Sequence, residues 1–109
     1  PAELTGVLAR LQEAEYLERP AAAQLRHAGE LRRRQEAQTK QLAVLRDGGE
    51  EGQERLSVVR DVRRLEAEAG ELERTVTQLT ARAQTEREQA RKDLMQLPGM
   101  TPQAPPGLG

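Results

Sequence analysis

Apolar residues between Val58 and Leu97 recur at intervals of three and then four positions. This spacing averages about 3.5 residues, and it keeps one stripe of a helix against a partner helix. The two positions of the repeat are Val62, Ala69, Val76, Ala83, Ala90, Leu97 and Val58, Leu65, Leu72, Leu79, Glu86, Asp93. The pattern therefore predicts a coiled-coil helix, which we place at residues 53–97.

A weaker apolar pattern precedes this repeat and predicts a first helical arm at residues 1–46. Its second half carries a stripe made of Ala21, Leu25, Ala28, Leu31, Gln35, Gln38, Leu42 and Leu45. Pro20 lies within the arm, where a proline removes a backbone hydrogen bond at a cost of about 3 kcal/mol. In the first turn of a new helix it is tolerated. We therefore expect the first arm to be kinked or broken near residues 19–20.

A glycine-rich segment at residues 47–52 separates the two arms. Three of its residues are glycines, of which Gly48 is suited to the left-handed conformation that ends a helix. Glu50 and Glu51 suit the positive N-terminal end of the next helix. The segment therefore predicts a turn. Residues 98–109, rich in proline and glycine, are expected to form a disordered tail.

Two arms of equal length around a glycine-rich turn indicate an antiparallel helical hairpin. Folding the chain about the turn pairs Leu42 with Val58 and Val59, Leu31 with Ala69, Leu25 with Val76, Leu4 with Leu97, Gly29 with Gly70, and Arg10 with Glu86 and Asp93. The paired glycines indicate either close approach of the backbones or coincidence. The charged set indicates either a patch that sets the register or a solvated end. A parallel dimer through residues 58–97 is the competing architecture.

The composition supports an all-α fold without a globular core. Tyr16 is the single aromatic residue, and 32% of the chain is charged. We expect an elongated antiparallel helical hairpin or coiled coil. Because alanine and glutamine occupy many positions of the stripes, the apolar area that two helices bury is modest. The hairpin is therefore expected to belong to a larger helical bundle, formed with a helical protein partner or a second copy of itself.

Several classes of function lack the residues that they require. The chain has no cysteine, one histidine (His27), one serine (Ser57) and no phosphate-binding glycine loop. We therefore predict no enzyme activity, catalytic residue, cofactor, metal or small-molecule substrate. The net charge is −1, and acidic residues surround the arginine clusters, so no nucleic-acid partner is expected. No apolar run is long enough to span a membrane, and no signal peptide is recognisable. The expected location is cytoplasmic, with the cytoskeleton as one setting.

One group of residues around the turn is the candidate partner surface. Its apolar members exceed what a single stripe can hide, and three arginines lie beside them. The predicted partner-binding residues are Leu42, Val44, Leu45, Leu56, Val59, Arg60, Arg63 and Arg64. A locally thick hairpin core is the alternative interpretation of the apolar members, and a solvated face is the alternative for the arginines.

In composition the whole chain resembles the broad group of coiled-coil scaffold subunits. That resemblance implies a structural interaction subunit that docks into a multi-protein assembly, in a cytoskeletal, centrosomal, ciliary or membrane-trafficking setting. The alternative is a regulatory hairpin acting on a molecular machine. In outline the chain is similar to the hairpin stalk proteins of secretion-system ATPases, although no motif residue is shared. A small-GTPase effector is a further form of that alternative.

Overall fold

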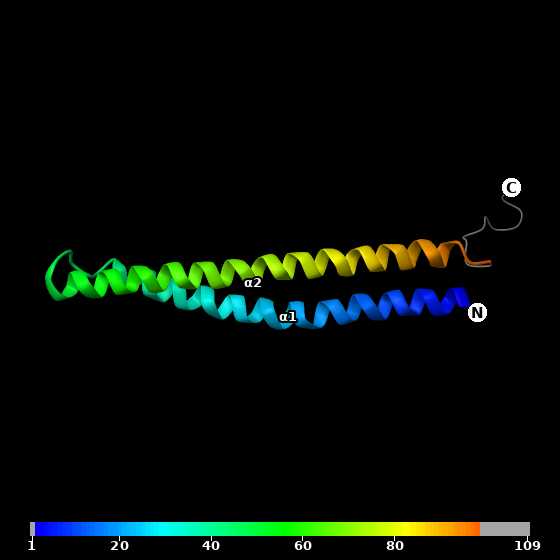
Figure 1. The fold of residues 1–109 in the computed structure, drawn as a ribbon, viewed down its shortest axis with the longest axis horizontal. Helices are drawn as coiled ribbons and strands as arrows, with labels where there is room; N and C mark the ends of the chain where they lie inside the picture. The colour runs from blue at the N-terminus through cyan, green and yellow to red at the C-terminus, as the bar shows by residue number, and fades with distance from the viewer. Residues whose placement is uncertain (1, 99–109) are drawn as a thin grey trace, which may run out of the picture. The chain divides into compact units, whose positions relative to one another are not determined.

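The computed structural model describes residues 2–98 and contains two helices in this range. Helix α1 spans Ala2–Leu42, helix α2 spans Gly49–Met95, and a loop of residues 43–48 joins them. The helices run in opposite directions, and no strand occurs among the described residues (Figure 1). The predicted all-α helical hairpin is thus confirmed. The predicted disorder of the tail concerns residues that lie, apart from Pro98, outside the described range.

The chain divides into two units, each of which is an antiparallel pair of helix segments. The terminal pair consists of residues 2–20 of α1 and the part of α2 from residue 79 onward. The loop pair consists of residues 21–78, which include the connecting loop. In the terminal pair, the first residues of α1 lie beside the last turns of α2 (Figure 1).

The heptad repeat of α2 faces α1 in both pairs. We call the positions of the repeat that face the other helix the seam. Every described seam residue from Val58 to Leu97 is buried or half-buried, including the polar Glu86 and Asp93. Val58, Leu65 and Ala69 are buried in the loop pair. The spacing of apolar residues therefore located the buried side of α2 correctly.

The buried side of α1 follows a seven-residue spacing that differs from the predicted stripe at one position. Ala21, Ala28 and Leu31 are buried as expected, but Leu25 is 56% exposed. Its neighbour Gln24 is half-buried instead. Residue 24 lies seven positions before Leu31, so a strict repeat assigns it to the seam. The predicted pairing of Leu25 with Val76 inside the seam is therefore wrong.

Helix α1 passes through Pro20 without interruption. Of the kink or break expected at residues 19–20, the break does not occur, because the seam spacing continues unchanged on either side of the proline. Ala14 and Ala21, one heptad apart, are both buried, whereas Pro20 is exposed. An exposed position suits proline best within a helix, because water can solvate the carbonyl group that lacks a hydrogen-bond donor.

The loop lies four residues earlier than the predicted turn. Helix α1 ends at Leu42 rather than residue 46, and α2 begins at Gly49 rather than residue 53. Gly48 and Gly49 have φ angles of 90° and 61°, a region that favours glycine. The amide of Gly52 donates to the carbonyl oxygen of Gly48 at 2.8 Å, which closes the first turn of α2. The glycines therefore start the second helix, with Glu50 and Glu51 in its first turn as expected.

Two predicted contacts in the loop pair have different outcomes. Leu31, Leu65 and Ala69 form one buried cluster, so the pairing of Leu31 with Ala69 is confirmed. A Cβ atom added to Gly29 or Gly70 would meet only an arginine side chain of its own helix within 4 Å. The predicted close approach of the two backbones at these glycines is therefore wrong, and their pairing in the sequence is a coincidence.

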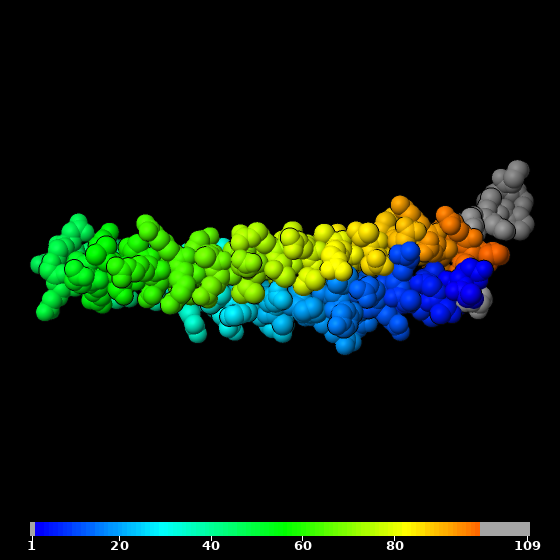
Figure 2. Space-filling view, viewed as in Figure 1, coloured from blue at the N-terminus to red at the C-terminus, as the bar shows by residue number. Residues whose placement is uncertain are grey.

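The terminal pair has a thin seam built largely from alanine. Ala14 and Ala83 are fully buried and pack with Leu17, with Leu79 beside them. Arg10 bonds to Glu86 at 3.2 Å and to Asp93 at 3.1 Å, so the predicted charged set forms across the two helices. The space-filling view shows the two segments of this pair in direct contact (Figure 2). Opposite charges, rather than large apolar groups, occupy part of this seam.

Candidate interaction surface

All eight predicted partner-binding residues belong to the loop pair. Leu42 is the last residue of α1, Val44 and Leu45 lie in the loop, and the other five lie between residues 56 and 64 of α2. The exposed fraction is 79% for Val44 and 53% for Leu56, while Leu42, Leu45 and Val59 are half-buried. Among the apolar members, Val44 and Leu56 are therefore exposed, whereas Leu42, Leu45 and Val59 are partly covered by the hairpin.

Four of these residues share one outer side of α2. Leu56, Val59, Arg60 and Arg63 follow the spacing i, i+3, i+4, i+7, which aligns side chains along a single helix face. We call these four residues the outer stripe. Val58, their neighbour in sequence, is instead 6% exposed and faces α1. The outer stripe thus begins with apolar side chains and continues with two cationic ones.

The loop that carries Val44 is held by Arg55, a residue that the sequence analysis did not single out. Its Nη1 atom donates to the carbonyl oxygens of Leu42 at 2.7 Å and of Leu45 at 3.4 Å. Its Nε atom lies 3.2 Å from the carboxylate of Asp47. The carbonyl of the last residue of α1 and one carbonyl of the loop are therefore bound by a side chain of α2. An arginine seven residues before Val62, at a seam position, was the signal that could have identified it.

A second bond fixes the other end of the loop. The backbone amide of Arg46 donates to the carboxylate of Glu51 at 2.9 Å. Together with the contacts of Arg55, this bond ties both halves of the loop to the first two turns of α2. Val44 is consequently presented on an ordered support, and less conformational entropy is lost when a partner covers it.

The three arginines of the predicted site have different surroundings. Arg64 lies 3.5 Å from a carboxylate oxygen of Asp61 and 4.0 Å from one of Glu68. Among the described residues, Arg60 and Arg63 form no ion pair, and both are exposed. Two of the three guanidinium groups are thus available to an anionic group of a partner, while the third is engaged within α2.

A polar network spans the two helices further along the loop pair. Arg32 of α1 contacts Gln35 at 2.9 Å and reaches both Glu66 and Glu73 of α2, and Gln35 donates to Glu66 at 2.8 Å. The hydrogen bond from Arg32 lowers the pKa of the Glu66 carboxyl group, and Gln35 adds to this effect. The hydrogen bonds that Arg32 donates to Glu73 and Glu66 raise the pKa of Arg32. Because Arg32, Glu66 and Glu73 are all engaged in bonds between the two helices, the network fixes the register and offers a partner little.

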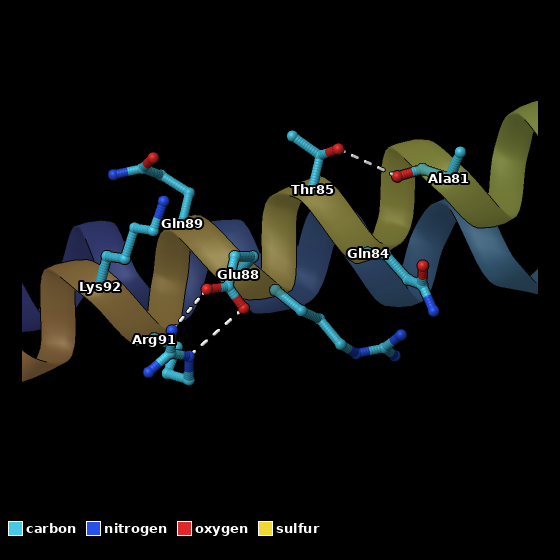
Figure 3. Close-up of a pocket in the computed structure, with 8 residues that line it drawn as sticks. Ala81, Gln84, Thr85, Glu88, Gln89, Arg91 and Lys92 are labelled. Carbon is cyan, nitrogen blue, oxygen red and sulfur yellow. Dashed lines mark hydrogen bonds and ion pairs between the residues drawn. The ribbon is translucent and has the colours of Figure 1, made fainter.

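The hollow shown in Figure 3 is an open furrow on one helix of the terminal pair. All of its lining residues come from residues 81–92 of α2, and their side chains splay outward from that helix (Figure 3). Thr85 donates to the carbonyl of Ala81, and Arg91 pairs with Glu88. Hydrogen bonding to Arg91 lowers the pKa of Glu88. Since the furrow has no opposing wall, it cannot exclude water from reacting groups.

Metal-binding and membrane-spanning features are the remaining possibilities to consider in the described part of the chain. His27 is exposed, and no cluster of three or more His, Cys, Asp or Glu residues within residues 2–98 is arranged to hold a metal ion. Neither described helix contains a stretch that is long and apolar enough to cross a membrane. No protein-family model matches the chain, and comparison with curated proteins and with solved structures gives no match.

Proposed function

We propose that the protein is a non-enzymatic interaction subunit that docks a helical partner against the end of the loop pair. The observation that carries this proposal is the contrast along α2 between Val58, which is 6% exposed, and Leu56, which is 53% exposed. Leu56 lies beside the half-buried Val59 on the outer stripe, and the exposed Val44 lies in the loop. The hairpin does not cover these apolar groups, and a second molecule would gain free energy by covering them.

The expected gain is sufficient for a specific contact. Burying a leucine or valine side chain contributes about 1.5–3 kcal/mol relative to leaving it exposed. Leu56, Val59 and Val44 together therefore give a small group of anchors of the kind that dominates binding energy at interfaces. A helix laid along the outer stripe would contact Leu56 and Val59 at the spacing by which amphipathic helices pack in grooves.

This proposal places the protein in a multi-protein assembly, with a helical protein partner or a second copy as the binding molecule. The proposed setting is cytoplasmic, in cytoskeletal or membrane-trafficking structures that use coiled-coil subunits as spacers. A net charge of −1 and the absence of aromatic side chains near the arginines argue against nucleic acid as the partner.

The test is recovery of the tagged full chain from the cells that produce it, followed by identification of its companions and measurement of the mass of the complex. The double variant Leu56→Glu/Val59→Glu should lose the companion while its helical circular dichroism is retained. Leu8→Glu is a matched control, because Leu8 is 52% exposed but belongs to the terminal pair. Unchanged recovery of the companion by the double variant would refute the proposal.

A regulatory hairpin that acts on a molecular machine is the second candidate. The unpaired Arg60 and Arg63 favour it, because ATPase rings and small GTPases can present acidic surfaces to a basic helix face. Charge reversal at both arginines would then abolish binding of a nucleotide-hydrolysing companion and change its rate of hydrolysis. If the protein is instead a scaffold held by apolar contacts, the same charge reversal would weaken binding. It would not change the rate of nucleotide hydrolysis by any companion.

A further inference from the structure

We infer that the partner segment bound by the outer stripe is an acidic amphipathic helix. This inference rests on the proposed function, and it adds the chemistry of the partner and the two residues that select it. Its basis is the combination on one helix face of Leu56 and Val59 with the unpaired cations Arg60 and Arg63.

The spacing of the stripe defines the pattern that a complementary helix must carry. Arg63 follows Val59 by one helical turn and Leu56 by two turns, so it continues the line of the apolar anchors. Arg60 lies beside that line, four residues after Leu56. A helix packed along the stripe therefore needs apolar side chains opposite Leu56 and Val59. One to two turns away, it needs a carboxylate opposite the arginines.

The charges around the stripe select an acidic partner because the neighbouring carboxylates are already engaged. Asp61 pairs with Arg64, and Glu66 is held by Arg32 and Gln35 from the other helix. Glu54 accepts a hydrogen bond from Gln41 of α1 at 3.1 Å. No acidic group of the loop pair is thus paired with Arg60 or Arg63, and a cationic partner would be repelled there.

A second copy that presents the same stripe does not meet this requirement. In a two-fold symmetric pair, the stripe would pack against its own reversed sequence. Leu56 would then lie opposite Arg63, and neither molecule would supply a carboxylate to Arg60 or Arg63. Such a contact would cover apolar surface while leaving cations without partners, which is unfavourable compared with an acidic helix.

The experiment uses the full chain and three fluorescein-labelled helical peptides with the same leucine positions. The peptides carry glutamate, glutamine or lysine beside the leucines, and binding is followed by fluorescence anisotropy over a series of salt concentrations. We expect the glutamate peptide to bind about tenfold more tightly than the glutamine peptide, as two exposed ion pairs would give. The lysine peptide should bind most weakly, and the differences should shrink as salt rises.

The variant Arg60→Glu/Arg63→Glu should reverse the order of the glutamate and lysine peptides. Arg33→Glu/Arg34→Glu is the control, because it changes the net charge equally at two exposed arginines of α1 in the same pair. That control should leave the order unchanged. Circular dichroism of each variant establishes that its helices are intact.

The outcomes separate this inference from the proposed function. Equal binding of all three peptides, lost in Leu56→Glu/Val59→Glu, would overturn the acidic partner and leave helix docking in place. A charge preference that is insensitive to Leu56→Glu/Val59→Glu would contradict docking on the outer stripe. Failure of all three peptides to bind, or the same loss of preference in Arg33→Glu/Arg34→Glu, would also overturn the acidic-partner inference.

Discussion

The terminal pair and the loop pair use the same seven-residue repeat but fill it with different side chains. In the terminal pair, fully buried alanines alternate with Arg10, Glu86 and Asp93, which bond to one another across the seam. In the loop pair, Leu31 and Leu65 pack with Ala69 in the buried seam, and the polar seam positions Gln24 and Gln38 are uncharged. The terminal pair thus bonds the charged groups of its seam to one another. Both pairs expose apolar side chains outside the seam, among them Leu8 in the terminal pair and Leu56 in the loop pair, and in the loop pair Leu56 shares a helix face with the unpaired Arg60 and Arg63.

The difference also extends to polar residues within the seam. In the loop pair, Gln24 and Gln38 each have a buried amide oxygen without a hydrogen-bond partner. Such an atom lowers stability, because its hydration is lost and no bond replaces it. A charged set such as that of Arg10 provides its own bonds and restricts the register. The same seven-residue repeat therefore accommodates polar groups that bond to one another, as in the terminal pair, and polar groups without a hydrogen-bond partner, as in the loop pair.

The largest expected effect concerns the buried leucine cluster in the seam of the loop pair. Leu65 is 4% exposed and packs with Leu31, Ala69 and Leu72. Leu65→Ala should lower the free energy of unfolding by about 2–4 kcal/mol, because a buried leucine leaves a cavity. Leu56→Ala, the same substitution on the outer stripe, should change it by less than about 0.5 kcal/mol. Urea unfolding followed by circular dichroism measures both, and equal effects would refute the assignment of the two faces.

The charged seam of the terminal pair should give the next largest effect. Arg10→Ala leaves Glu86 and Asp93 half-buried without their cation, so we expect a loss of about 1 kcal/mol. Replacing all three residues with leucine should restore or exceed the original stability, since well-packed apolar groups commonly replace ion pairs without loss. Thermal unfolding at low and high salt gives the comparison. If the triple variant is less stable than Arg10→Ala, the charged groups contribute to the free energy of unfolding as well as fixing the register of the two helices.

The glutamines of the loop pair offer a test in the opposite direction. Gln38→Leu removes an unsatisfied buried oxygen and adds apolar area to the seam, so stability should rise by about 1 kcal/mol. Gln53→Leu is the control, because Gln53 is an exposed residue of α2 in the same pair. If both substitutions have the same effect in thermal unfolding, Gln38 does not belong to the seam in solution.

The smallest expected effect is the pH dependence of the network around Arg32. Glu66 has a lowered pKa in the folded chain, so its bonds stabilise the fold above the pKa of an unfolded glutamate, about 4.3. That contribution is lost as the pH falls below this value and through the lower folded pKa. Glu66→Gln should therefore flatten the decline in melting temperature between about pH 5 and pH 3. An identical decline in the variant and the parent chain would assign the pH dependence to other carboxylates.

The sequence was sufficient to predict which side of α2 is buried, because apolar residues spaced alternately by three and four positions line a single face of a helix. It was also sufficient to pair Leu31 with Ala69 and Arg10 with its two acids, since both follow from folding about a central turn. These predictions depend only on helix periodicity and chain length. They therefore hold although the position of the turn was misjudged by four residues.

The errors arose where side-chain interactions override backbone preference. Helix α1 ends at Leu42, whose carbonyl accepts a hydrogen bond from Arg55, and glycine composition alone does not reveal that contact. A break at Pro20 was one of the two expected outcomes, and it does not occur because the exposed position of the proline allows the helix to continue. Leu25 was assigned to the seam on hydrophobicity, although strict spacing assigns Gln24 there. In the candidate site, the sequence did not reveal that Arg64 is engaged by Asp61 and Glu68 while Arg60 and Arg63 form no ion pair among the described residues.

The central claim is that the chain supplies both halves of its own seam and leaves the outer stripe for a partner. Spin labels at Ala22 and Thr77, two exposed residues of the loop pair, test it directly because the chain contains no native cysteine. Pulsed electron resonance on doubly labelled chains diluted with unlabelled chains should give one distance of roughly 2–3 nm, as adjacent helices require. A distance near 8 nm, as in one continuous helix with a rise of about 1.5 Å per residue, would contradict the hairpin and the docking surface built on it.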